Sequence, residues 1–127
     1  MDANITTNEK KVDFFISEKD KYVVLSFQGQ IGRTFEQTLV ECWKHISKTQ
    51  ADQIILNFHD VTQFDKHGLS AFVRFEKQVR EKPAQLRICF VNHPLYKFLN
   101  DEGAIRPDEI TMDLAEAIQS FQNKNNK

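Results

Sequence analysis

The segment from Gln53 to Phe58, which reads Gln-Ile-Ile-Leu-Asn-Phe, constrains the fold of this chain more than any other part. Its apolar residues are nearly continuous, whereas a strand with one face in water alternates apolar and polar residues. Such a run is typical of a central strand that is buried on both faces of a sheet. It therefore predicts a sheet that is covered by protein on both sides.

Strand-type and helix-type segments alternate along the rest of the chain. Further strands are predicted over residues 12–17, 22–27, 86–91 and 110–112, and the first two form a hairpin. Helices are predicted to begin near Thr34, Gly68, Asn92 and Asp113. The order β-β-α-β-α-β-α-β-α indicates an α/β (α+β) fold, with a mixed sheet of four to five strands and about four helices packed over it.

The first helix carries the plainest helical signal. Thr34 is followed three residues later by Gln37, which is the spacing of a capping box, so we expect the Thr34 side chain to cap this helix. The apolar residues then recur at helical spacing and predict the buried face of the helix, namely Phe35, Leu39, Cys42 and Ile46.

One folded domain is predicted, from residue 12 to residue 121. A chain of 127 residues that is 40% hydrophobic is long and apolar enough to bury a core without disulfides. Residues 1–11 and the polar tract 122–127 have little apolar surface to bury. We therefore expect a flexible N-terminal segment and a disordered tail.

Composition argues against several classes of protein. The net charge of −1 provides no overall attraction to nucleic acid or to an anionic membrane. No apolar run approaches the roughly 20 residues that span a bilayer, and the N-terminus lacks the apolar stretch of a signal peptide. Cys42 and Cys89 lie in apolar segments and are expected to be buried, reduced thiols. No Cys/His spacing predicts a metal, and no cofactor is indicated. Because the thiols are expected to be reduced and no signal peptide or membrane span is predicted, we expect a cytoplasmic protein.

The turn that follows the central strand, Asp65-Lys66-His67-Gly68, is where we expect the function to lie. The helix after it exposes free backbone N–H groups and the positive end of its dipole. Loops of this kind are favoured places for recognition and for phosphate chemistry. Asp65 is expected to cap the helix.

Several pieces of the chain, in their order, resemble the STAS domain, the fold of bacterial anti-sigma-factor antagonists that is also found appended to anion transporters. Residues 24–31 are similar to the family's strand that ends in a Gly-Glu-Leu type of turn, and residues 54–68 to its strand followed by an Asp-Ser-Ser-Gly turn. Residues 86–91 and 95–103 resemble its later strand and the leucine-rich helix that ends in glycine. The resemblance covers residues 12–121.

The resemblance implies a phosphorylation switch that this sequence lacks. In phosphorylatable members, the first serine after the aspartate receives a phosphoryl group from a partner kinase. Here that position is Lys66 and the next is His67, so only Asp65 and Gly68 match the motif. Lysine has no hydroxyl, and its charge is opposite to that of phosphoserine. We therefore expect the serine switch to be absent.

Two interpretations of Lys66 stay open, namely a fixed positive contact for an acidic or phosphorylated partner and a solvated loop lysine. His67 is either a pH-sensitive contact or a polar turn residue. Thr62, in the preceding turn, and Ser70 are the nearest hydroxyls that would replace the missing serine. Arg33 follows another strand and is expected at the same end of the sheet.

The predicted partner-binding residues all belong to this end of the sheet. They are Gly29, Ile31, Arg33, Thr62, Asp65, Lys66, His67, Gly68 and Ser70. The eleven phenylalanines are expected mainly in the core, and the alternative for Phe35, Phe64 and Phe75 is an exposed apolar patch at this end, which would indicate an interface.

The resemblance implies a non-catalytic interaction module in a bacterial partner-switching system that regulates transcription. Its partner would be an anti-sigma factor or a serine-kinase-like protein, and dimerisation is left open. A second hypothesis is an accessory STAS subunit that docks on a membrane transport ATPase. A third is an enzyme that uses Asp65 and His67, which needs a pocket and an oriented acid–base pair.

Overall fold

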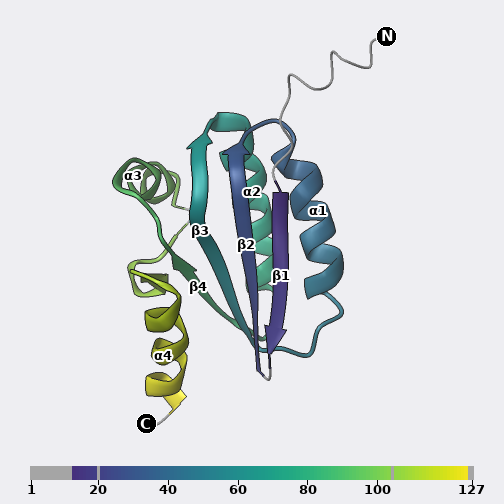
Figure 1. Ribbon diagram of the computed structural model, residues 1–127, viewed down its shortest axis with the longest axis vertical. Helices are drawn as coiled ribbons and strands as arrows, with labels where there is room; N and C mark the ends of the chain where they lie inside the picture. The colour runs from purple at the N-terminus through teal and green to yellow at the C-terminus, as the bar shows by residue number, and fades with distance from the viewer. Residues whose placement is uncertain (1–12, 20, 104, 126–127) are drawn as a thin grey trace.

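A computed structural model of the protein describes residues 13–19, 21–103 and 105–125 (Figure 1). Its five strands form one sheet in the order β1-β2-β3-β4-β5. The strands are β1 (Asp13–Lys19), β2 (Tyr22–Ile31), β3 (Gln53–Phe64), β4 (Gln85–Cys89) and β5 (Ile110–Thr111). The β1–β2 pair is an antiparallel hairpin, and every other pair is parallel. The predicted mixed α/β sheet is therefore confirmed.

Within the described residues, four α-helices and a short 3-10 helix connect and cover the strands. They are α1 (Phe35–Ile46), α2 (Lys66–Arg80), α3 (His93–Asp101), the 3-10 helix η2 (Pro107–Glu109) and α4 (Leu114–Asn125). In Figure 1, α1 and α2 lie side by side behind the sheet, and α3 lies beyond the edge of β3 near its upper end. A smaller apolar cluster joins α4 to the opposite face of the sheet.

The first half of the central strand β3, residues 53–58, is largely buried on both faces, as its sequence predicts. Ile54 and Leu56 belong to the main core between the sheet and the helices α1 and α2. Ile55, which points the other way, packs in the smaller cluster with Ala117 and Phe121 of α4. Because successive side chains of a strand point to opposite faces, a strand between two protein layers carries a nearly continuous run of apolar residues.

Helix α1 confirms one prediction and corrects another. Its buried face contains the four residues expected from helical spacing, together with Thr38. Thr34 occupies the N-cap position, but its side chain makes no capping hydrogen bond. Its backbone has helical dihedral angles (φ −81°, ψ −6°) instead of the extended conformation from which a capping side chain reaches the first turn. The predicted capping box is therefore wrong.

Strands β2 and β3 are longer than predicted because they stay paired beyond the apolar runs. Gly29 pairs with Val61, and Ile31 pairs with Phe64. Thr62 therefore lies in a strand and not in the turn where we expected it. Helix α2 begins at Lys66, two residues before the predicted start. The connection between β3 and α2 is reduced to the single residue Asp65.

Helix α4 also extends beyond its predicted end. The Asp113 side chain accepts a hydrogen bond from the backbone N–H of Glu116 (2.8 Å), which confirms the predicted cap. The helix continues to Asn125, so residues 122–125 are helical where we expected a disordered tail. Residues 1–11 and 126–127, which carry the other predictions about the termini, lie outside the described part of the chain.

Candidate functional site

The predicted site lies where β2 and β3 end side by side and lead into α1 and α2, at the upper end of the sheet in Figure 1. The backbone N–H of Asp65 donates to the carbonyl oxygen of Ile31 (2.9 Å), which joins the two strand ends directly. Gly29 and Ile31 come from β2, Thr62 comes from β3, and the remaining predicted residues come from the loop after β2 or the start of α2. The fold thus brings the predicted site residues to one end of the sheet.

Asp65 caps helix α2. Its backbone is extended, and its carboxylate oxygen Oδ1 accepts a hydrogen bond from the backbone N–H of Gly68 (3.1 Å). A carboxylate at this position satisfies a free N–H group and lies at the positive end of the helix dipole. The predicted cap is confirmed, and this carboxylate therefore has a structural role.

Gly68 allows α2 to begin in contact with the backbone of β2. A Cβ atom at this position would lie 2.3 Å from Cγ2 of Ile31 and 2.8 Å from its carbonyl carbon and oxygen. Glycine is therefore required by the close approach of two backbones. Gly68 and Ile31 are both buried, so they position α2 and offer no side-chain surface to a partner.

Apart from the capping Asp65, which is also exposed, five of the predicted residues have side chains exposed at this end of the molecule. We call these five the sheet-end surface: Arg33, Thr62, Lys66, His67 and Ser70. No acidic residue occupies the first turn of α2. In the described part of the chain, no carboxylate forms an ion pair with Lys66. A cation at a helix N-terminus costs about 0.3–1 kcal/mol, and the neighbouring carboxylate of Asp65, which caps the same helix, offsets part of that cost.

A small groove of about 180 Å³ adjoins the sheet-end surface between α2 and the end of α3. Lys66, Ser70 and Glu102 supply its polar lining, and Leu69, Val73 and Phe98 supply its apolar lining. Neither Phe98 nor Glu102 is among the residues that the sequence predicts for this site. The contact between α2 and α3 is tertiary, and no spacing along the chain indicates it.

The expected patch of exposed phenylalanines at this end is absent among the described residues. Phe35 and Phe75 are 0% and 2% exposed, and Phe64 is half-buried with its ring edge-on to Phe98. Phe35 begins α1 against β2, where its ring packs edge-on to Phe27. The alternative of an exposed patch is therefore wrong, because Phe35 and Phe75 belong to the main core and Phe64 packs against it.

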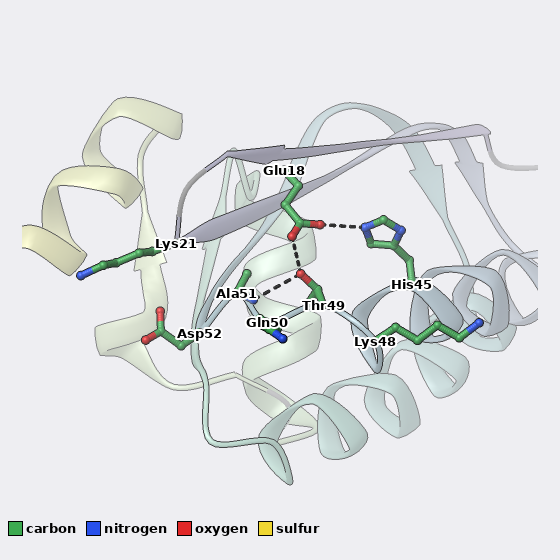
Figure 2. A pocket seen from close by; sticks show the side chains of 8 residues that line it. All are labelled: Glu18, Lys21, His45, Lys48, Thr49, Gln50, Ala51 and Asp52. Atoms are coloured by element: carbon green, nitrogen blue, oxygen red, sulfur yellow. Dashed lines mark hydrogen bonds and ion pairs between the residues drawn. The ribbon is translucent and has the colours of Figure 1, made fainter.

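A larger hollow of about 680 Å³ lies at the opposite end of the sheet (Figure 2). In Figure 2 the Glu18 carboxylate points to His45 and Thr49, with His45 Nε2 3.1 Å from Oε1 and the Thr49 hydroxyl donating to Oε2 at 2.6 Å. Lys21, Lys48 and Asp52 also line the hollow. The hydrogen bonds from Thr49 and His45 lower the pKa of Glu18. These contacts join the end of β1 to the last turn of α1 and to the loop that follows it.

Neither cysteine is poised for chemistry. Cys42 and Cys89 are both buried and free, as predicted. Burial raises the pKa of each thiol to about 12, so neither forms a thiolate near neutral pH. Across the described residues, no three His, Cys, Asp or Glu side chains are grouped to hold a metal ion.

A known protein family matches most of the chain. The family model for the STAS domain matches residues 8–117. A comparison with curated protein sequences found no match. No helix in the described part of the chain is long and apolar enough to cross a membrane.

Several solved structures share the fold at low sequence identity. SpoIIAA of Bacillus in its phosphorylated form is 16% identical with a TM-score of 0.68, over 86% of this chain and 99% of that one. An anti-sigma factor antagonist from Mycobacterium paratuberculosis is 12% identical with a TM-score of 0.74, over 88% and 95%. The murine anion transporter Slc26a9 is 10% identical with a TM-score of 0.70, over 84% of this chain and 18% of that one. The family match covers most of the chain, and the chain therefore belongs to the STAS domain family.

Proposed function

We propose that this STAS protein is a non-catalytic interaction module of a cytoplasmic bacterial partner-switching system, and that it binds its partner through the sheet-end surface. The observation that carries the proposal is the position of Lys66. It is exposed at the first residue of α2, directly after the capping Asp65, and it has no ion-pair partner among the described residues.

Lys66 occupies the position at which the resemblance to phosphorylatable antagonists expects a serine. A lysine there accepts no phosphoryl group by Ser/Thr chemistry, and it presents a constant positive charge. An acidic or phosphorylated group on a partner would form an ion pair with Lys66 and would offset its unfavourable interaction with the helix dipole. We infer that binding is not switched by phosphorylation of this turn and instead depends on the state of the partner.

The groove beside Lys66 supports a protein partner. Leu69, Val73 and Phe98 provide apolar contact next to the charged residues Lys66 and Glu102. An apolar centre with a polar rim is the usual composition of a protein–protein interface. The partner class implied by the family is an anti-sigma factor or a serine-kinase-like protein.

Affinity capture from the source lysate tests the proposal, with the wild type and Lys66→Glu compared by mass spectrometry. Lys19→Glu is the matched control, because it reverses an exposed lysine at the far end of β1. We expect a kinase-like partner to be held by the wild type and by the control and to be lost from Lys66→Glu. Equal capture by all three proteins would remove Lys66 from the interface. Stoichiometric phosphate on residues 62–70 would contradict the unswitched mode of binding.

The alternative function is an accessory subunit of a membrane transport ATPase. It is favoured by the structural similarity between this chain and a part of the Slc26a9 anion transporter that makes up 18% of the transporter chain. The same capture experiment distinguishes the two functions, because an ATPase in place of a kinase-like protein would support the accessory subunit.

A further inference from the structure

A buried group of charged side chains joins the C-terminal half of α2 to η2, away from the sheet-end surface. Glu76 and Glu109 are 3% and 7% exposed. The Arg80 guanidinium donates from Nη1 and Nη2 to the two carboxylate oxygens of Glu109, at 2.5 and 2.7 Å. It also donates from Nε to Oε1 of Glu76 at 3.2 Å. One arginine is therefore shared by two buried carboxylates.

The two carboxylates are not equally satisfied. Glu109 accepts both parallel N–H groups of the guanidinium, the strongest geometry for such a pair. Glu76 accepts one longer bond, and its other oxygen Oε2 is buried without a hydrogen-bond partner. Because an uncompensated buried charge is costly, the less satisfied carboxylate is the one that takes up a proton.

The charged groups around Glu76 support this assignment. Burial is the largest influence and raises the pKa of Glu76 to about 7. Arg80 on the same helix and Arg106, which precedes η2, act in the opposite direction, and Glu109 of η2 adds to the increase. Because Arg106 is exposed, solvent screens its charge. A guanidinium already engaged by Glu109 does not fully compensate Glu76.

We propose that Glu76 binds a proton in the folded protein, and that loss of this proton draws Arg80 away from Glu109 and loosens the attachment of η2 to α2. Helix η2 leads directly into β5, which holds the edge of the sheet through its pairing with Ile88 and Cys89. The connection to α4 therefore responds to pH near neutrality. This inference is independent of the partner-binding proposal.

Carbon-13 NMR of the glutamate side-chain carboxyls tests the proposal, with the resonance of Glu76 assigned from its absence in Glu76→Gln. We expect Glu76 to titrate with a midpoint near 7, and the backbone amides of residues 109–111 to shift with the same midpoint. In Glu76→Gln those amides should show no transition in this range. The proposal would be overturned by an ordinary titration midpoint near 4.5 for Glu76. It would also be overturned if the amide chemical shifts of residues 109–111 did not change as Glu76 titrates.

A second variant keeps the test decisive if Glu76→Gln does not fold. Glu109→Gln removes the negative charge that competes with Glu76 for Arg80. We expect the midpoint of Glu76 to fall by about one pH unit or more, since an unshared opposite charge lowers a carboxyl pKa. An unchanged midpoint would show that the two carboxylates do not compete for Arg80. Lys66→Glu is the distant control and should leave the titration as it is in the wild type.

Discussion

A Cβ atom added to Gly68 would lie 2.3 Å from Cγ2 of Ile31. The first turn of α2 therefore rests against the last residue of β2, with no room for a side chain between them. The same contact, together with the hydrogen bond from Asp65 to Ile31, sets the direction in which α2 leaves the sheet. Lys66 and His67 are exposed because this close approach places the opposite side of the turn in solvent.

Gly68→Ala is expected to destabilise the protein by about 1–3 kcal/mol, the usual cost of forcing extra atoms into a packed site. The obstacle includes the Ile31 backbone, which yields less readily than a side chain. Urea unfolding followed by circular dichroism measures the loss. Ser70→Ala, an exposed change two residues further along the same helix, should remain within about 0.5 kcal/mol of the wild type. Equal stability of both variants would contradict the close packing.

Asp65→Ala is expected to lower the free energy of unfolding by about 1 kcal/mol, because the backbone N–H of Gly68 loses its side-chain acceptor. Asp65→Asn keeps an oxygen acceptor and should retain most of the stability. Chemical denaturation of the three proteins at one pH checks this. A loss in Asp65→Asn as large as that in Asp65→Ala would show that the negative charge matters more than the hydrogen bond.

Thr49→Val is expected to raise the pKa of Glu18 towards its ordinary value. The threonine hydroxyl donates to Glu18, and this bond is the largest cause of the lowered pKa. A depressed carboxyl pKa contributes stability above the unfolded-state pKa, and that stability is lost as the pH falls through the folded-state value. The variant should therefore lose less stability in acid than the wild type.

Carbon-13 titration of the Glu18 carboxyl gives the direct measurement for this variant. Thr62→Val is the matched control, since it changes an exposed threonine at the other end of the sheet. If the pKa of Glu18 were the same in all three proteins, the contact drawn in Figure 2 would not exist in solution.

Glu76 is expected to make the protein less stable as the pH rises from about 4.5 towards 7. Its folded-state pKa lies above the unfolded value, so in this window the folded protein holds a proton that the unfolded chain has lost. The slope is at most about 1.4 kcal/mol per pH unit for one group, and it disappears above the folded-state pKa.

The Glu76 contribution is isolated by the difference in unfolding free energy between the wild type and Glu76→Gln at several pH values. The variant carries no titrating group at this position, so the difference should change across the window and be constant above it. A constant difference at all pH values would mean that Glu76 has an ordinary pKa in the folded protein.

The sequence alone predicted the features that depend on neighbouring residues. Asp65 and Asp113 each cap the helix that follows them, because a cap involves only residues three apart in the chain. The sequence also predicted that residues 53–58 of β3 are covered on both faces of the sheet, since a strand between two layers has a nearly continuous run of apolar residues. The predicted capping box at Thr34 was wrong for a related reason. The spacing of the residues matched the motif, but the backbone of Thr34 is helical, and spacing alone does not determine that conformation.

Features that depend on distant parts of the chain were missed. Strand β3 continues to Phe64 because β2 pairs with it, and nothing in its own polar residues indicates an extended strand. Glu76 and Arg80 are spaced like an ordinary exposed helical pair, yet η2 covers them and adds a second carboxylate. Phe98 and Glu102 border the site only because α3 folds against α2.

By itself, the sequence determined the succession of strands and helices, the buried faces of the central elements, and the lysine at the start of α2. These features depend on residues that are close together in the chain, because hydrophobic periodicity and helix capping involve only near neighbours in sequence. Only the tertiary structure decided which predicted site residues are exposed, which groove adjoins Lys66, and which of two buried carboxylates lacks a full partner. Burial and charge compensation depend on side chains brought together from distant segments, so no local pattern records them.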